Sequence, residues 1–170
     1  NPSRRDPHVE FITQQRQPAS DSNAHPQRDQ LIAYTLDYVG LLLEAPVQVD
    51  VPRLGMVQLP HPLAYALQKV LIRPERQRNR QNVAKDSADA FKIVASFRAA
   101  WIKWRPEFRH WSDHPQYGAW IRQAQNLWSQ LYDRIADRGA QEVNAAYPNY
   151  DVAAIVTIMR DLRDVLAPPT

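Results

Sequence analysis

Charged residues that could act on an ionic ligand are concentrated in the middle of the chain. Four arginines, Arg73, Arg76, Arg78 and Arg80, fall within eight positions. Guanidinium groups bind phosphates and carboxylates, so this stretch is suited to an anionic partner. A basic run is equally typical of a solvated loop, and the net charge of +3 permits an anionic partner without requiring one.

A second group has the residue types of a zinc site. His110, Asp113 and His114 lie within one short stretch, and neutral imidazole together with a carboxylate can bind zinc. The stretch lacks an HExxH motif, and the sequence offers no third ligand at a distance. We therefore expect no metal site there.

Five tryptophans could stack on nucleic-acid bases, because arginine and lysine residues are interleaved with several of them. Packing in the protein interior is the favoured interpretation. Two of the five fall on an apolar helical stripe, and the others surround a turn between helices, where large rings fill volume. The five are Trp101, Trp104, Trp111, Trp120 and Trp128.

The elements that must position these residues begin with short strands. Alternating apolar residues predict a strand at 9–13, and the polar stretch 14–27 is typical of a loop. Residues 31–43 fit a helix loosely and could equally hold a strand. The alternating runs 47–51 and 55–59 predict a β-hairpin or two neighbouring strands.

Apolar residues at helical spacing then predict four helices, with Gly139 as the residue that follows the third. The expected fold class is α+β and mostly α, with short β-strands or a hairpin at the N-terminal side followed by a helical bundle of about four helices. We expect two domains, 1–60 and 61–170. The predicted helices span 63–73, 82–105, 120–138 and 152–166.

Composition excludes several classes of protein. The chain has no cysteine, so it has no disulfide, thiolate zinc site or cysteine nucleophile. Its four glycines stand apart, and no glycine-rich phosphate-binding motif occurs. Apolar runs are too short to cross a bilayer and no signal peptide opens the chain, so we expect a cytoplasmic protein without a membrane partner. Because it begins at Asn1, we expect a fragment.

One block of the sequence resembles a known family. Residues 59–73 hold a helix carrying Lys69 and Arg73, and residues 82–91 hold Lys85, Asp86 and Asp89 after the basic stretch. This order is similar to the C-terminal part of the minimal nucleotidyltransferase-fold proteins, which include AbiEii-type toxins. The similarity covers about half of the chain, roughly 9–97, and makes 1–60 a partial nucleotidyltransferase-like lobe.

The resemblance implies roles for individual residues. Glu10 would be the third metal-binding carboxylate and would take part in catalysis, binding Mg²⁺. Lys69, Arg73 and Lys85 would form a cationic wall facing the phosphates of an NTP, and Asp86 and Asp89 would order that wall through ion pairs. The family's first two acids lie upstream of the third and are not present, so we expect the chain to be inactive alone.

The function that follows is transfer of a nucleotide from an NTP to an unknown acceptor, RNA or protein, by a protein of which this chain is the C-terminal portion. The resemblance implies Mg²⁺ and NTP as cofactors, and whether the chain is itself an enzyme stays open. The alternative is a non-enzymatic helical module for protein interaction or dimerisation. An RNA-binding adaptor that uses the arginine stretch is a third hypothesis. A homo-oligomer or an upstream domain would be a further partner.

Overall fold

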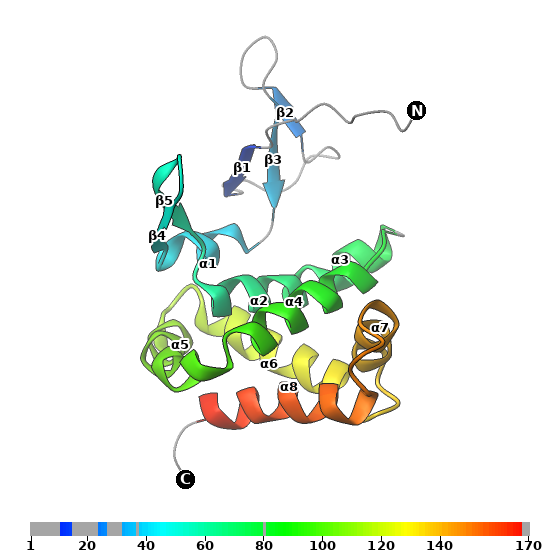
Figure 1. Cartoon of the computed structure of the whole chain (residues 1–170). Helices are drawn as coiled ribbons and strands as arrows, with labels where there is room; N and C mark the ends of the chain where they lie inside the picture. Colours follow the sequence, from blue (N-terminus) through cyan, green and yellow to red (C-terminus); the bar gives the residue numbers. More distant parts are fainter. Residues whose placement is uncertain (1–10, 15–23, 27–31, 37, 80, 168–170) are drawn as a thin grey trace. The chain divides into compact units, whose positions relative to one another are not determined.

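Figure 1 shows a computed structural model of the chain, which describes residues 11–14, 24–26, 32–36, 38–79 and 81–167. The chain divides into two units, Asn1–Gly40 and Leu41–Thr170. The expected domain boundary after residue 60 stays a prediction. The first unit holds a three-stranded sheet of order β1-β3-β2, in which β3 pairs parallel with β1 and antiparallel with β2. The strands are β1 (Phe11–Gln14), β2 (Ala24–Pro26) and β3 (Ile32–Leu36).

The ambiguous stretch 31–43 contains both a strand and a helix, since β3 is followed by α1 (Val39–Glu44). A hairpin then opens the larger unit, with β4 (Val47–Val51) paired antiparallel to β5 (Gly55–Leu59). Its turn places Arg53 at φ 71 and Gly55 at φ 75, the left-handed region in which glycine is unstrained. The predicted hairpin is confirmed.

The rest of the larger unit is helical, as Figure 1 shows. The expected fold class, mostly α with a hairpin at the N-terminal side, is confirmed. The four predicted helices correspond to α2, α4, α6 and α8, and shorter helices connect them. The described helices are α2 (Pro62–Leu71), α3 (Arg73–Arg78), α4 (Ala84–Ser96), the 3₁₀ helix η1 (Arg98–Trp104), α5 (Arg105–Asp113), α6 (Gly118–Tyr132), α7 (Arg138–Ala146) and α8 (Val152–Leu166).

The prediction of one long helix over 82–105 is wrong, because the chain changes from α4 to η1 at Phe97. A 3₁₀ helix has three residues per turn, so Trp101 and Trp104 lie one above the other, and both are buried. The Trp101 indole Nε1 donates to the Val94 carbonyl at 3.0 Å, near the end of α4. Ile102, which lies between the two tryptophans in the sequence, is 69% exposed.

The arginine stretch expected to be a loop is also helical over Arg73–Arg78. Pro74 stands in the first turn of α3, where a missing N–H breaks no intrahelical hydrogen bond. Its fixed φ therefore starts this helix, in addition to separating it from α2. As a result Arg73, Arg76 and Arg78 belong to a short helix that follows α2 directly.

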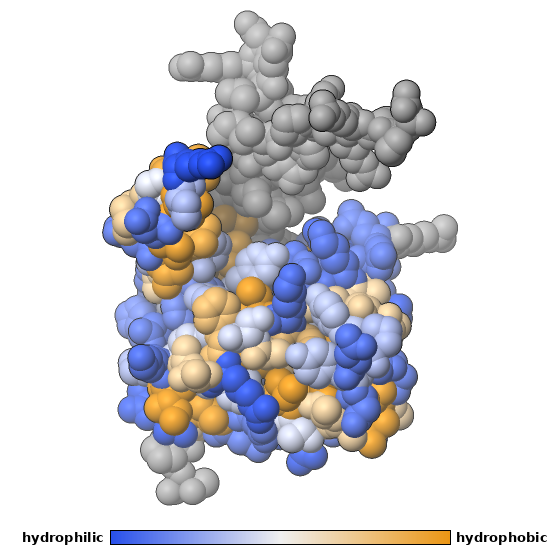
Figure 2. Space-filling model, in the orientation of Figure 1, coloured by the Kyte–Doolittle hydropathy of each residue, from blue (hydrophilic) through white to orange (hydrophobic). Residues whose placement is uncertain are grey.

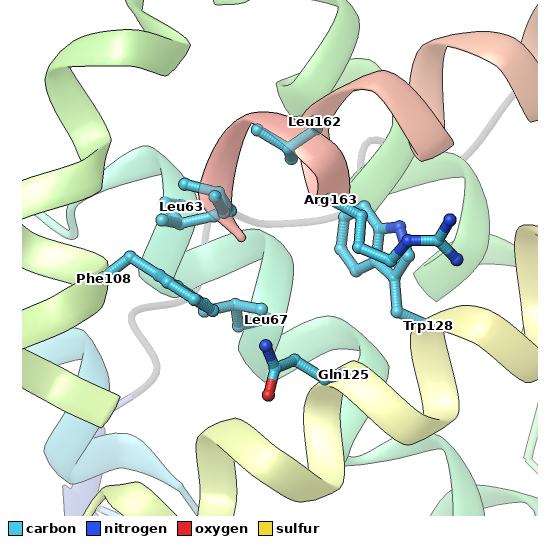
Figure 3. A pocket seen from close by; sticks show the side chains of 8 residues that line it. Leu63, Leu67, Phe108, Gln125, Trp128, Leu162 and Arg163 are labelled. Carbon is cyan, nitrogen blue, oxygen red and sulfur yellow. The ribbon is translucent and has the colours of Figure 1, made fainter. Parts of the chain in front are cut away.

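The core of the larger unit is built from the apolar faces of α2, α4, α6 and α8. Figure 3 shows part of it, where Leu67 of α2, Phe108 of α5, Trp128 of α6 and Leu162 of α8 surround a cavity of about 20 Å³. A space of that size lined by apolar groups gives water few partners. Packing as the main role of the tryptophans is confirmed, since four of the five are at most 4% exposed.

Gly139 does not end a helix as expected but lies in the first turn of α7, where it touches α6. A Cβ at this position would lie 2.8 Å from both the Cβ and the backbone oxygen of Leu131, and 2.8 Å from a ring carbon of Tyr132. Only glycine allows this approach without moving one of the two helices.

Replacing Gly139 with alanine is therefore expected to lower the free energy of unfolding by about 1–3 kcal/mol, although alanine is the better helix former. Urea unfolding followed by far-UV circular dichroism measures the change. Ala145→Gly, at an exposed position of the same helix, serves as the control and is expected to cost about 1 kcal/mol through propensity alone. A Gly139→Ala protein as stable as the parent would contradict the close approach.

Candidate functional site

Lys69 and the two aspartates are brought together by the pairing of α2 with α4. The apolar residues Leu63, Leu67 and Val70 turn one face of α2 into the core, which leaves Lys69 beside the first turns of α4. Asp86 and Asp89 are three residues apart, so both lie on one face of α4. Helical periodicity on two neighbouring segments thus places one cation opposite two carboxylates.

Four residues form an ion cluster that ties α2, α3 and α4 together. The Lys69 ammonium lies 3.4 Å from Asp86 Oδ1 and 3.6 Å from Asp89 Oδ2. Arg76 Nη1 donates to both oxygens of Asp86, at 3.0 and 3.1 Å. The Asp86 side chain is fully buried, whereas that of Arg76 is 33% exposed. Two cations and two anions leave the ion cluster formally neutral.

Arg73 is the centre of a second, more buried group, the Arg73 network of Arg73, Ser87 and Glu142. Arg73 Nη1 donates to the Val83 carbonyl at 2.8 Å, to Glu142 Oε2 at 2.8 Å and to the Ser87 hydroxyl. Ser87 in turn donates to Glu142 Oε2 at 2.7 Å. The network therefore fastens α7 to α3 and α4.

The network lies beside the fully buried phenol of Tyr132. Burial raises the pKa of Tyr132 to about 12, although Ser87 and Arg73 act in the opposite direction. The phenol therefore keeps its proton throughout the neutral range. It adds no charge to this part of the interior.

The Glu142 carboxylate is stabilised in its ionised form. Burial by itself would raise the pKa of Glu142, but the hydrogen bonds from Arg73, Ser87 and Arg138 together outweigh burial and lower it. A carboxyl group whose pKa is lower in the folded protein stabilises the fold above its unfolded pKa. That stabilisation is lost as the pH falls through the folded pKa.

We therefore expect the free energy of unfolding to fall as the pH drops below the ordinary pKa of a glutamate, in part because Glu142 becomes protonated. Urea titrations at half-unit pH steps measure this, with Glu142→Gln as the comparison. The glutamine variant is expected to be less stable at neutral pH and to show a smaller fall on acidification. Parallel curves for the two proteins would contradict the prediction.

The structure brings together three of the residues that were expected to act together and keeps two others apart from them. Lys69, Asp86 and Asp89 are in contact, and the two aspartates are the ion partners of Lys69. Arg73 is only 4% exposed and is bonded inward, and Lys85 is exposed and lies outside the ion cluster. Glu10 lies outside the described residues, so its role in metal binding and catalysis stays a prediction.

Three participants were missed by sequence reasoning. Arg76 was assigned to a loop, yet it binds Asp86 in two places. Ser87 gave no signal of its own. Glu142 stands four residues after Arg138, and Arg138 Nε lies 2.8 Å from Glu142 Oε1. The four-residue separation in the sequence alone predicts a surface pair on α7. Its contact with Arg73 spans 69 positions.

The described residues do not suit a magnesium ion. Among residues 38–79 and 81–167, no group of three or more histidines, aspartates and glutamates could hold a metal. The carboxylates of Asp86 and Asp89 face the positive groups of Lys69 and Arg76, which compete with a cation. No catalytic step is therefore assigned to a metal held by these residues.

The histidines of the second predicted group make other contacts. His110 is 64% exposed on its side chain and lies 3.8 Å from Glu44. His114 Nδ1 accepts from the Gln116 amide at 3.2 Å, and its ring stacks on Tyr117 at 4.3 Å. Hydrogen bonding and stacking account for the position of the His114 ring.

A large groove lies beside the ion cluster, between the hairpin and α4. Its volume is about 660 Å³, within the range of ligand-binding sites. Most of its lining is apolar, and its polar residues are His61, Tyr65, Asp89 and Lys92. Asp89 belongs to both the groove and the ion cluster, so the two features are adjacent.

A family model described as Nucleotidyltransferase matches residues 2–111. The chain belongs to this family. The matched range contains the whole ion cluster and the whole groove, and the resemblance stated from Lys69, Lys85, Asp86 and Asp89 is thereby confirmed. The matched range ends within α5, so α6, α7 and α8 lie beyond it. No curated protein and no solved structure matches the chain.

A membrane-spanning helix is absent from the part of the chain that the structure describes, since none of its helices is both long and apolar enough.

Proposed function

We propose that this nucleotidyltransferase-family chain takes part in transferring a nucleotide from an NTP to an acceptor. In such a reaction a nucleophilic oxygen of the acceptor attacks the α-phosphorus, a new P–O bond forms, and the bond to pyrophosphate breaks. The observation that carries the proposal is the ion cluster, which lies within the matched range and holds two cations next to the groove.

The ion cluster is suited to holding cations in place for a phosphate chain. Lys69 is fixed between two carboxylates, and Arg76 bonds to Asp86 through one of its nitrogens only. A guanidinium has five N–H donors, and a third of the Arg76 side chain is exposed. Arg76 therefore replaces buried Arg73 in the proposed phosphate-facing wall, alongside Lys69 and Lys85.

The remaining parts of the family chemistry are also proposals. Glu10 keeps its proposed role as a metal-binding and catalytic carboxylate, and Mg²⁺ with NTP remain the cofactors that membership of the family favours. RNA and protein are the proposed acceptors. In the absence of a ligand the ion cluster is neutral, because Lys69 and Arg76 are paired with Asp86 and Asp89.

The test uses the chain with Mg²⁺, each NTP labelled at the α-phosphorus, and total RNA and protein as acceptors. Transfer of α-label, but not of γ-label, is expected. Arg76→Ala is expected to reduce transfer at least tenfold, whereas Lys85→Ala, an exposed residue outside the ion cluster, should reduce it less. Circular dichroism checks that both variants fold. No α-label transferred and no NTP bound in calorimetry would overturn the proposal.

Self-association through the hairpin is a second candidate function, in line with the interaction-module hypothesis. Leu54 is 76% exposed and Met56 63% exposed, and Figure 2 shows apolar surface on the hairpin. Exposed apolar residues grouped at one place favour a contact with a partner. Sedimentation equilibrium tests it, since Leu54→Ser with Met56→Ser should shift a dimer to monomer. A parent chain that is monomeric at all concentrations would exclude this function.

A further inference from the structure

We propose that the groove between the hairpin and α4 binds the nucleoside part of the NTP, with the phosphates directed toward Lys92 and the ion cluster. This inference rests on the proposed function and deepens it, because it assigns the base and sugar to residues that no other observation has assigned. It follows from the shape of the groove, from its lining, and from the position of its polar residues.

Two groups of apolar residues line the groove. One consists of Val47, Val49 and Leu59 of the hairpin, and the other includes Phe97 and Trp104. The Phe97 and Trp104 rings lie 6.1 Å apart at an interplanar angle of 42°. A nucleobase has two apolar faces and stacks on aromatic rings, so a slot with apolar and aromatic walls suits it.

Exposure of the wall residues is consistent with a site open to solvent. Phe97 is 41% exposed, and Val49 and Leu59 are 38% and 43% exposed. These side chains would lose contact with water when a flat ring enters between them. Burial of apolar surface on both faces of the base would then contribute to binding.

His61, which lines the groove, offers a neutral polar contact. Burial lowers the pKa of His61, with Glu107 acting in the opposite direction. His61 Nδ1 accepts from the Leu63 amide at 3.2 Å, which caps α2. A neutral imidazole whose Nδ1 accepts carries its proton on Nε2, so this nitrogen is a donor.

The charged residues that line the groove come from α4. Asp89 and Lys92 lie on successive turns of α4, and both line the groove. Asp89 is also 3.6 Å from Lys69, which links the groove to the cations of the ion cluster. An apolar slot lined by Lys92, with Lys69 next to the shared Asp89, complements a ligand with a heterocycle at one end and negative charges at the other. A nucleoside triphosphate has this distribution.

Equilibrium dialysis of radiolabelled NTPs, with nucleosides and tripolyphosphate as competitors, tests the inference. Two variants change the groove: Phe97→Ala removes one stacking partner, and Val49→Trp fills the slot. Each is expected to raise the Kd for NTP about tenfold. The matched control is Ile102→Ala, which removes an apolar side chain that is 69% exposed and lies outside the groove, and should leave the Kd unchanged.

The outcomes separate this inference from the proposed function. Bound NTP that is displaced by a nucleoside and weakened by both groove variants supports the inference. Bound or transferred NTP with unchanged Kd in Phe97→Ala and Val49→Trp overturns the groove assignment and leaves the function standing. Displacement by tripolyphosphate alone also overturns it. A parent chain that neither binds nor transfers a nucleotide overturns both.

Discussion

Replacing Asp86 with alanine is expected to lower the free energy of unfolding by about 3 kcal/mol, the largest effect of any single change in the ion cluster. The Asp86 carboxylate is fully buried and forms ion pairs with both Lys69 and Arg76. Its removal leaves two cations near a small void. The estimate stays at the low end for a broken buried pair, because Lys69 keeps Asp89 and Arg76 is partly solvated.

Thermal unfolding by circular dichroism measures this effect, and for a chain of this size the midpoint is expected to fall by about 6–12 °C. Asp89→Ala is the matched control on the same helix face. Its side chain is 25% exposed and contacts Lys69 alone in the ion cluster, so the loss should be about 1 kcal/mol or less. Equal losses for Asp86→Ala and Asp89→Ala would show that Asp86 does not organise the ion cluster.

The second large effect is expected at Arg73, whose replacement with methionine should cost about 3 kcal/mol. The guanidinium binds a backbone carbonyl, Ser87 and Glu142 within the interior. Methionine fills the volume but leaves these acceptors without their donor. Arg98→Met is the control, because Arg98 pairs with Asp161 at the surface and should contribute about 1 kcal/mol or less.

A double-mutant cycle identifies the partner responsible. Arg73→Met combined with Glu142→Gln is expected to cost less than the sum of the single changes, since the two residues share one interaction. Hydrogen exchange provides a second readout: the amides of α7 should lose protection in both single variants, because the Arg73 network fastens this helix. Additive costs with unchanged exchange in α7 would contradict the proposed connection.

The two groups of residues differ in what they are expected to do. The Arg73 network lies in the interior and stabilises the fold. Its variants should therefore lower the free energy of unfolding much more than they change the affinity for a nucleotide. The ion cluster lies next to the groove and joins three helices, so its variants should change both. Comparing Kd with midpoint temperature across Arg73→Met and Arg76→Ala therefore separates a structural role from a ligand-binding one.

Local pattern was enough for much of the fold. The spacing of apolar residues predicted α2, α6 and α8. Each of these helices buries one face, and the residues of that face recur at helical spacing within a short stretch of sequence. The hairpin was predicted from two alternating runs around Pro52 and Gly55. The break of the long helix at Phe97 was not predicted, since the burial of Trp101 and Trp104 on a 3₁₀ turn depends on what packs against them.

For the candidate site, the sequence alone determined that Lys69, Asp86 and Asp89 share the α2–α4 region and that the chain resembles nucleotidyltransferases. Only the tertiary structure decided that Arg73 turns inward to Glu142 and that Arg76 takes the outer position on Asp86. Both arginines belong to one short basic stretch and have the same local signals. Their positions differ because α7, far along the chain, supplies a partly buried carboxylate to one of them.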